Sequence, residues 1–536
     1  KVDITFNFQP FQPLQNHQQR MLKDIDHLIK SNQIERAIDR AHRIIHLAKQ
    51  GLTYYHNYDY QVLLLIITVG YLSWIGSVLM YTVKHYTIYA KRFFSGDGQE
   101  TPQFFKRKNL FSISEFYIRL SLMLINSIIS LYMFHQSSPW SYHVYALFPL
   151  FFIGNMLTDV PLLIGFLNHQ HLLNPFKEAF IHIALFEAMV VGFFTRELFS
   201  GILLMIGIIP EFVDLAPYLP RLGWLLACAF LSIFTILPPS FDSMPSLIFL
   251  GVLVYMGFQH YYIVYYRKLV LSQSKKVLYI VQQSLILIAF LFILWMELCS
   301  SYGVYYVFNQ YILVGLVGVS ILLPFFASNT DFYHRLQSIS MGFIVPYILS
   351  SQSHDVLFYA ALDIMLKVWL WASIRERRHR TCSYLDRNDL RASIFYVILF
   401  NIALLGTNNI SSLTSIDISS SLRHFTYSSP LLKTIFNTIR ISIPMLNITI
   451  TTVVLTRIAG IPLFGLFFLV IGLFDLLTIN FFFLVKREGD WTTILDSITR
   501  FAVANLYTLS ICIFVTLSLL FTFGLRLHQT SSKLKK

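Results

Sequence analysis

Long apolar runs recur from residue 62 to residue 524, and they constrain the fold more than any other feature of the chain. Most of them hold roughly 17 to 25 residues, enough for a helix to cross a hydrocarbon core of about 30 Å. The composition agrees, because 55% of the 536 residues are hydrophobic and only 13% are charged. We therefore predict an all-α fold, a polytopic transmembrane bundle of about 13–15 helices, and not a soluble domain. The predicted spans are 62–83, 116–134, 145–166, 180–195, 198–216, 222–238, 246–266, 277–297, 305–327, 339–351, 356–374, 393–406, 434–456, 460–485 and 500–524.

Basic side chains gather in alternate connections between these runs. The basic segments are residues 84–108, 267–276 and 375–391 and the tail at 527–536. Since Lys and Arg in short loops stay in the cytosol, we predict that these segments are cytosolic. An odd number of spans then puts residues 1–61 on the opposite side, together with the stretch GTNNISSLTSID at 406–417. The net charge of +13 follows from this distribution, so it does not indicate a nucleic-acid-binding protein.

Residues 1–61 differ from the multi-pass region predicted at 62–526. After a Gln-rich start, apolar side chains recur at helical spacing with charges between them, which predicts two amphipathic helices broken near Ser31 and Asn32. Such helices can lie on the membrane surface or form the stalk of a soluble domain. The segment begins with neither an initiator Met nor a signal peptide. We therefore expect the chain to start inside a longer protein.

The sequence shows no catalytic or metal-binding motif. Its four cysteines are scattered without CxxC spacing, and GxSxG, P-loop, GxGxxG and HExxH patterns are absent. His169 and His171 have no nearby carboxylate, so a surface loop explains them better than a metal site. We expect no cofactor in this chain.

Several charged or amide side chains fall inside predicted spans, where they are costly and usually face a cavity or another helix. Asp363 and Lys367, in ALDIMLKVW, are four residues apart and therefore share one helical face, where they can neutralise each other. They could form a polar wall for a lipid headgroup, or a buried pair that fixes helix packing. Asp475 and Asn480 form a similar polar patch, and Glu187 needs a partner that the sequence does not name.

Four stretches, in this order along the chain, resemble the PIG-N family of GPI ethanolamine phosphate transferases. They are KQGLTYYHNYD at 49–59, SNTDFYHRLQSIS at 328–340, GTNNISSLTSID at 406–417 and FFFLVKREGDW at 481–491. Together they extend over nearly the whole chain. Two departures affect local loops: Asn408 stands where the family has a second Gly, and Arg487–Glu488 replaces Asp-Tyr.

The resemblance implies an enzyme of the endoplasmic reticulum membrane that moves phosphoethanolamine from phosphatidylethanolamine onto the first mannose of a GPI precursor. In that family the chemistry belongs to a lumenal phosphatase-like domain with zinc and a Thr nucleophile, which lies upstream of the matched region. We therefore expect this chain to be the membrane domain that follows the missing catalytic domain, with its N-terminal segment lumenal and its C-terminus cytosolic. Zinc is expected in the missing domain.

The polar stretch at 406–417 fits a lumenal rim for the two lipid substrates. Asn408, Asn409 and Asp417 offer hydrogen bonds to sugar hydroxyls. Lys486 could attract a lipid phosphate, and Trp491 could anchor its helix at the interface. A helix end followed by a flexible loop explains the same residues equally well.

Two other classes stay open at this point. A polytopic lipid transporter or scramblase would also have many helices and intramembrane charge, and it predicts transport by this chain alone. A structural scaffold would tolerate loss of the polar groups named above. The sequence indicates phosphatidylethanolamine and GPI-precursor lipids as partners, with protein partners unknown.

Overall fold

In the computed structural model the chain folds into two compact units, residues 1–84 with 89–169 and residues 85–88 with 170–536. The structure describes residues 11, 13, 18–57, 60–87, 108–135, 140–169, 173–209, 218–238, 244–266, 273–299, 306–326, 332–377, 384–406, 410–412, 415–416, 430–486 and 489–523.

The first unit begins with the two predicted amphipathic helices, α2 (Gln18–Lys30) and α3 (Ile34–Asn57). Asn32 adopts a left-handed backbone with φ 58° between them. The Gln33 amide donates to the Leu28 carbonyl at 3.0 Å, and the Asn32 amide donates to the Ile29 carbonyl at 3.1 Å. These bonds form a Schellman motif, in which a left-handed residue ends a helix. The predicted break near Asn32 is therefore confirmed.

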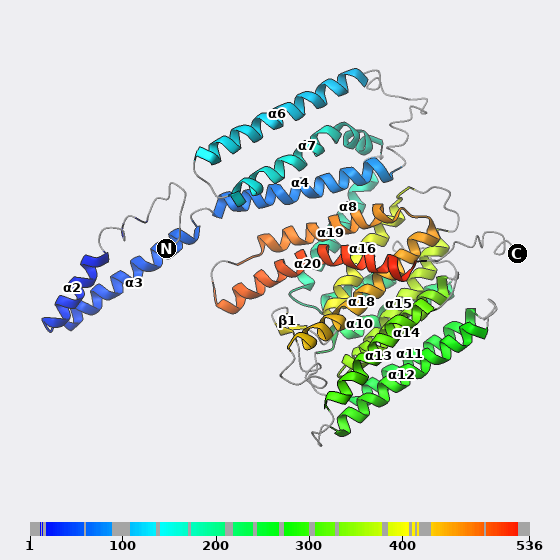
Figure 1. Ribbon diagram of the computed structural model, residues 1–536. Coiled ribbons are helices and arrows are strands. Elements are labelled where there is room, and N and C mark those ends of the chain that lie inside the picture. Colours follow the sequence, from blue (N-terminus) through cyan, green and yellow to red (C-terminus); the bar gives the residue numbers. More distant parts are fainter. Residues whose placement is uncertain are drawn as a thin grey trace. The chain divides into compact units, whose positions relative to one another are not determined.

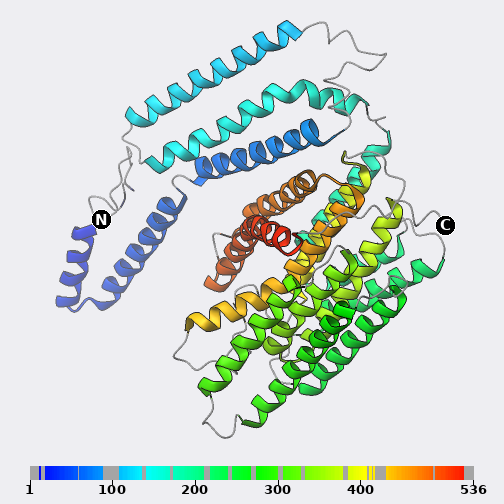
Figure 2. The ribbon, with the colours of Figure 1, turned by 45° about the vertical axis from the view of Figure 1, so that its right-hand side comes forward.

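Three long apolar helices complete the first unit: α4 (Tyr60–Tyr86), α6 (Lys108–His135) and α7 (Trp140–His169). Figure 2 shows α7 between α4 and α6. The Ser77 hydroxyl donates to the Phe152 carbonyl at 3.0 Å, which joins α4 to α7. Near the end of α4, the Lys84 ammonium lies 2.8 Å from the Asp159 carboxylate. Lys84 is thus a helix residue with a partner, although the sequence had assigned it to a basic loop.

Within the described residues, the second unit holds twelve further helices, and each overlaps one predicted span. They are α8 (Leu173–Gly192), α9 (Leu198–Ile208), α10 (Tyr218–Ile236), α11 (Pro245–Tyr266), α12 (Gln273–Cys299), α13 (Tyr306–Phe326), α14 (Phe332–Ser350), α15 (Asp355–Glu376), α16 (Arg387–Leu405), α18 (Pro430–Ala459), α19 (Leu463–Phe483) and α20 (Trp491–Phe521).

Among the described residues of both units, 11 helices are long and apolar enough to cross a membrane. The apolar parts of α8, α9 and α10 are shorter, and α14 is not one of the 11. The predicted all-α multi-pass fold is confirmed. With 11 residues, α9 rises about 16 Å, which is only half of a hydrocarbon core.

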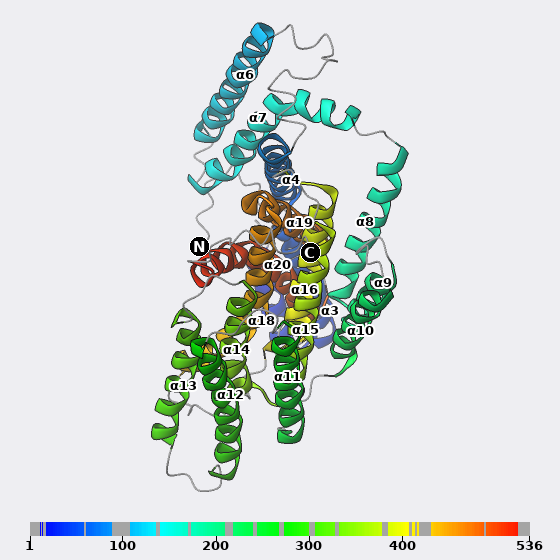
Figure 3. The ribbon, with the colours of Figure 1, turned by 90° about the vertical axis from the view of Figure 1, so that its right-hand side faces the viewer.

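Helices α14, α15, α16 and α18 are largely buried in the second unit. Figure 1 shows α12, α13 and α14 running alongside one another. In Figure 3, α9 and α10 lie side by side, and α10 also packs against α15. Because α15 contacts α10, α11, α14 and α18, it is enclosed by helices from distant parts of the sequence.

A glycine allows α11 and α15 to pack closely. A Cβ atom on Gly251 would lie 2.9 Å from the backbone nitrogen of Leu357 and 2.9 Å from the Val356 side chain. Real Cβ atoms essentially never make such short contacts, so a larger residue would push the helices apart. This close approach brings the polar residues further along α11 next to α15.

One short hairpin interrupts the helical fold. Strand β1 (Ile410–Ser412) pairs antiparallel with β2 (Ser415–Ile416), between α16 and α18. Both strands lie in the polar stretch 406–417, for which the sequence predicted no strand. Period-2 alternation over so few residues is too short a signal to predict a strand.

Candidate functional site

Asp363 and Lys367 form an ion pair in the middle of α15. Lys367 Nζ lies 2.6 Å from Asp363 Oδ2, and the two residues are 5% and 1% exposed. The spacing of four residues puts both side chains on the same side of the helix. The predicted pairing is confirmed, and its role in substrate binding stays a prediction.

Gln259 of α11 completes this pair. Lys367 Nζ donates to Gln259 Oε1 at 2.9 Å, and Gln259 Nε2 donates to Asp363 Oδ2 at 2.8 Å. The Lys367 ammonium also lies 5.3 Å from the ring centre of Phe258 and 5.0 Å from that of Tyr262. Aromatic faces attract cations, so these rings add to the compensation of the buried charge. The sequence analysis missed Gln259, because only the packing of α11 on α15 brings it to this place.

The polar network continues into α14 and α18. Asn447 Nδ2 lies 3.5 Å from Asp363 Oδ1, and the Ser340 hydroxyl donates to Asn447 Oδ1 at 3.3 Å. The Tyr359 hydroxyl donates to the Ser340 carbonyl at 3.1 Å. Four helices, α11, α14, α15 and α18, therefore meet through hydrogen bonds around one carboxylate. Such a network is stabilising only while its members are paired, so it fixes how these helices pack.

Two further ion pairs bind the ends of α15. Where α15 begins, Asp355 Oδ2 lies 2.6 Å from Arg440 Nη2 of α18, and both side chains are completely buried. Where α15 ends, Arg377 Nε lies 3.2 Å from Asp389 Oδ1 of α16. The sequence analysis did not single out either pair. Asp355 and Arg440 are 85 residues apart, and a charge at the edge of an apolar run does not name its partner.

His354 lies directly before α15 in the connection from α14. Burial lowers the pKa of His354, while the Asp355 carboxylate raises it and Arg196 lowers it further. The imidazole is therefore neutral at physiological pH. Arg196 comes from the turn between α8 and α9, where its guanidinium donates to the Leu237 carbonyl.

The other predicted site residues lie elsewhere. Asn408, Asn409 and Asp417 fall outside the described residues. Lys486 is exposed after α19, and its backbone amide donates to the Ser497 hydroxyl at 3.0 Å. Trp491 begins α20 and is 73% exposed. Lys486 and Trp491 thus belong to the connection between α19 and α20, whereas the Asp363 network is buried around α15.

Asp475 and Asn480, predicted to form an intramembrane polar patch, make hydrogen bonds to different helices. Asp475 Oδ1 accepts a hydrogen bond from the Thr508 hydroxyl of α20 at 3.0 Å. Asn480 Nδ2 donates back to the Leu476 carbonyl of its own helix at 3.4 Å. Each side chain therefore satisfies part of its hydrogen bonding separately, and Asp475 helps join α19 to α20.

Comparison with known proteins identifies the family. A family model described as phosphatidylinositolglycan class N (PIG-N) matches residues 50–490, which is most of the chain. The chain belongs to the PIG-N family. The match contains the two middle stretches that indicated the resemblance and all but one end residue of the first and last, so that prediction is confirmed.

Curated relatives carry the name GPI ethanolamine phosphate transferase 1. The Schizosaccharomyces pombe protein is 27% identical over 550 residues, covering 95% of this chain and 57% of the relative. The Aspergillus oryzae protein is 24% identical over 592 residues, covering 98% and 56%. The Homo sapiens protein is 24% identical over 577 residues, covering 100% and 58%. The chain thus spans little more than half the length of these relatives. No solved structure shows significant similarity to it.

Proposed function

We propose that this chain is the membrane domain of a transferase in the endoplasmic reticulum that moves phosphoethanolamine from phosphatidylethanolamine to the first mannose of a GPI precursor. The match to the PIG-N family over residues 50–490 carries this proposal. The names of the curated relatives support the reaction class. No comparison favours the lipid transporter or scramblase that the sequence left open.

In this proposal the catalytic domain and its zinc lie outside the chain. Among the described residues, no three His, Cys, Asp or Glu side chains come together as a metal site. The described residues thus offer no cluster of zinc ligands, and the proposal places no step of the reaction on zinc within them. The role of the chain is to hold the acyl chains of two lipids while their headgroups meet the catalytic domain.

The lumenal ends of the helices form the proposed substrate surface. With the N-terminal segment lumenal, α16 and α19 both end on the lumenal side, and α15 and α18 both begin there. Asn408, Asn409 and Asp417 follow α16 and would bind the sugar hydroxyls of the acceptor. Lys486 follows α19, and its exposed ammonium would attract a lipid phosphate. Trp491 would anchor α20 at the interface.

The ion pairs of α15 would fix the positions of the helices whose ends form this surface. Asp355 joins the lumenal end of α15 to Arg440, which lies ten residues into α18, so the pair would fix the depth of α18 relative to α15. Asp363 lies eight residues further along α15, a rise of about 12 Å, which puts the Asp363–Lys367 pair near the middle of its span. From there the pair could contact a headgroup only if the network opened.

Photo-crosslinking tests the substrate role. Membranes containing the protein are incubated with a diazirine analogue of phosphatidylethanolamine or of phosphatidylcholine, and labelled peptides are mapped. The proposal expects stronger labelling by the phosphatidylethanolamine probe, at peptides around 406–433 and 484–495. Replacing Lys486, the residue assigned to the lipid phosphate, by Gln should lower that labelling several-fold. Equal labelling by both probes at every site would argue against it.

A further inference from the structure

Arg500 of α20 is a cation at the edge of a membrane span. Helix α20 has 31 residues and rises about 46 Å, which exceeds a hydrocarbon core of about 30 Å. The predicted span 500–524 begins at Arg500, and the proposed topology makes the start of α20 lumenal. Helical side chains lean toward the N-terminus, so the guanidinium extends toward the lumenal headgroups. Lipid phosphates lie at this level of the membrane.

The guanidinium of Arg500 has no acceptor among the described residues. It forms no hydrogen bond or ion pair with them, and its Nε atom is buried without a partner. Its central carbon lies 4.1 Å from the ring centre of Phe194, which follows α8 and is 47% exposed. The ring attracts the charge but accepts none of the in-plane N–H bonds. A cation is costly at the edge of lipid, so these donors favour a ligand with an anionic group.

Asp496 lies one turn closer to the lumen on the same face of α20. It is four residues before Arg500, a rise of about 6 Å, and both residues are half-buried. The Asp496 carboxylate attracts the Arg500 charge, but no ion pair or hydrogen bond joins the two side chains. This face therefore presents a cation at the level of the phosphates and a separate anion about one turn further out.

The order of these charges matches the headgroup of phosphatidylethanolamine. In the lumenal leaflet its phosphate joins the glycerol, and its ammonium group lies further out at the free end. Arg500 can donate two parallel hydrogen bonds to the phosphate, and Asp496 can accept from the ammonium. Phosphatidylcholine carries a quaternary nitrogen without N–H, and phosphatidylglycerol has no cation. Neither headgroup can therefore satisfy both residues.

The same face adjoins the proposed substrate surface. Ser497 lies between Asp496 and Arg500, and its hydroxyl accepts a hydrogen bond from the Lys486 backbone amide at 3.0 Å. Lys486, which the proposed function assigns to a lipid phosphate, is thus held beside this part of α20. A lipid attracted by Lys486 would reach Arg500 without crossing the membrane.

We propose, resting on the proposed function, that Arg500 and Asp496 select the phosphoethanolamine headgroup of the donor lipid. Arg500 holds the phosphate, Asp496 accepts hydrogen bonds from the ammonium, and the exposed Phe194 ring lies against the guanidinium where the lipid approaches. The pair thus gives the substrate surface its preference for an ethanolamine headgroup.

Native mass spectrometry of the purified, delipidated protein tests the site with phosphatidylethanolamine, phosphatidylcholine and phosphatidylglycerol of identical acyl chains. The native protein should bind phosphatidylethanolamine several-fold more tightly than the other two. Arg500→Gln should weaken binding of all three lipids about tenfold, the effect of losing charge-assisted hydrogen bonds to phosphate. Arg500→Lys keeps the charge without the planar fork, so it should weaken binding less. Asp496→Asn should weaken phosphatidylethanolamine alone and abolish its preference over phosphatidylcholine.

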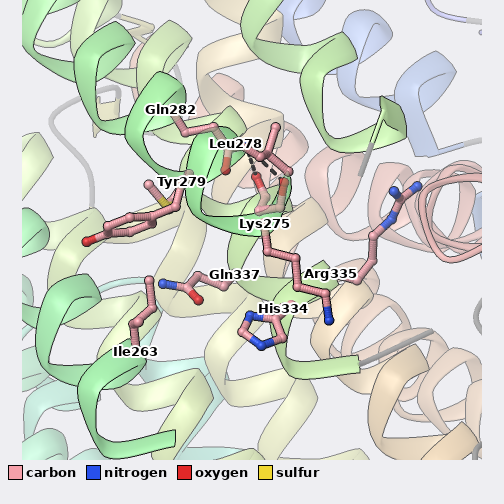
Figure 4. A pocket seen from close by; sticks show the side chains of 10 residues that line it. Ile263, Lys275, Leu278, Tyr279, Gln282, His334, Arg335 and Gln337 are labelled. Atoms are coloured by element: carbon pink, nitrogen blue, oxygen red, sulfur yellow. Dashed lines mark hydrogen bonds between the residues drawn. The ribbon is translucent and has the colours of Figure 1, made fainter. Parts of the chain in front are cut away.

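Lys275→Gln is the matched control. Lys275 is also half-buried, but it lines a pocket between the end of α11 and the starts of α12 and α14 (Figure 4), on the predicted cytosolic side. Losing its charge should leave the preference within about twofold of the native protein. Thermal unfolding of each variant shows that it is folded before its binding is compared. If Arg500→Gln does not fold, Arg500→Lys supplies the test of the phosphate contact.

The outcomes separate this inference from the proposed function. A preference for phosphatidylethanolamine that survives in folded Asp496→Asn would overturn the inference and leave the proposed function standing. Undiminished binding in the folded Arg500 variants, or an equal loss in Lys275→Gln, would do the same. A native protein that binds phosphatidylethanolamine no better than phosphatidylcholine would contradict both.

Discussion

Lys367 carries its charge in a part of α15 that is almost closed to solvent. An unpaired charge in the bilayer core costs several kcal/mol, and here the cost is offset by Asp363, by Gln259 and by two aromatic rings. The three polar groups depend on one another, since removing one leaves the others buried without a full set of partners. Substituting these residues singly and together therefore distinguishes a role in helix packing from a role in binding a lipid headgroup.

Lys367→Met should lower the amount of folded protein, because it leaves the Asp363 carboxylate buried with its countercharge removed, at a cost of about 3–5 kcal/mol. Replacing the three polar residues together, with Asp363→Leu, Lys367→Met and Gln259→Leu, should restore abundance. Protein abundance is measured beside phosphoethanolamine transfer in the full-length enzyme. If the pair contacts a headgroup, transfer stays low at restored abundance, and full recovery of transfer rules that role out.

At the scale of elements, each helix of the bundle coincides with an apolar run, because run length and hydropathy decide whether a segment can span lipid. The break between α2 and α3 was predictable too, because it depends on residues next to one another in the sequence. The side chains that bond to α15 from other helices were not predictable. Gln259, Asn447 and Arg440 become neighbours of α15 only after α11 and α18 pack against it, and a single sequence holds no signal for such distant contacts. Of the candidate site, sequence therefore predicts the i,i+4 pair and misses the network around it.

Gly251→Ala should destabilise the packing of α11 on α15, since its Cβ would meet the Leu357 backbone at 2.9 Å. We expect a loss of about 1–3 kcal/mol, seen as a lower unfolding temperature in detergent. Gly257→Ala is the matched control on the same helix, where a Cβ meets nothing within 4 Å. It should be neutral or slightly stabilising, because Ala favours helix more than Gly. Equal destabilisation by both changes would contradict the proposed close approach.

At the scale of the whole molecule, the account depends on which side of the membrane each connection occupies. Residues 1–61 and 407–433 are predicted to be lumenal, and 375–392 and the tail cytosolic, from the distribution of basic side chains. A protein with its four native cysteines replaced by Ser is given one cysteine, through Ser420→Cys or Arg380→Cys. In cells with only the plasma membrane permeabilised, an impermeant maleimide should label position 380 and spare position 420. The reverse pattern would invert the topology and with it the proposed substrate surface.

In the proposed function, the chain holds the lipid substrates while the chemistry takes place in a domain outside it. The measurement that tests it most directly is phosphoethanolamine transfer to a mannosylated GPI precursor in membranes that lack the resident enzyme. This chain is supplied alone, or joined behind the part of the Schizosaccharomyces pombe relative that the alignment does not cover, and zinc is measured in both purified proteins. We expect transfer and bound zinc for the joined protein and neither for the chain alone. Transfer by the chain alone, with one zinc ion per chain, would contradict it.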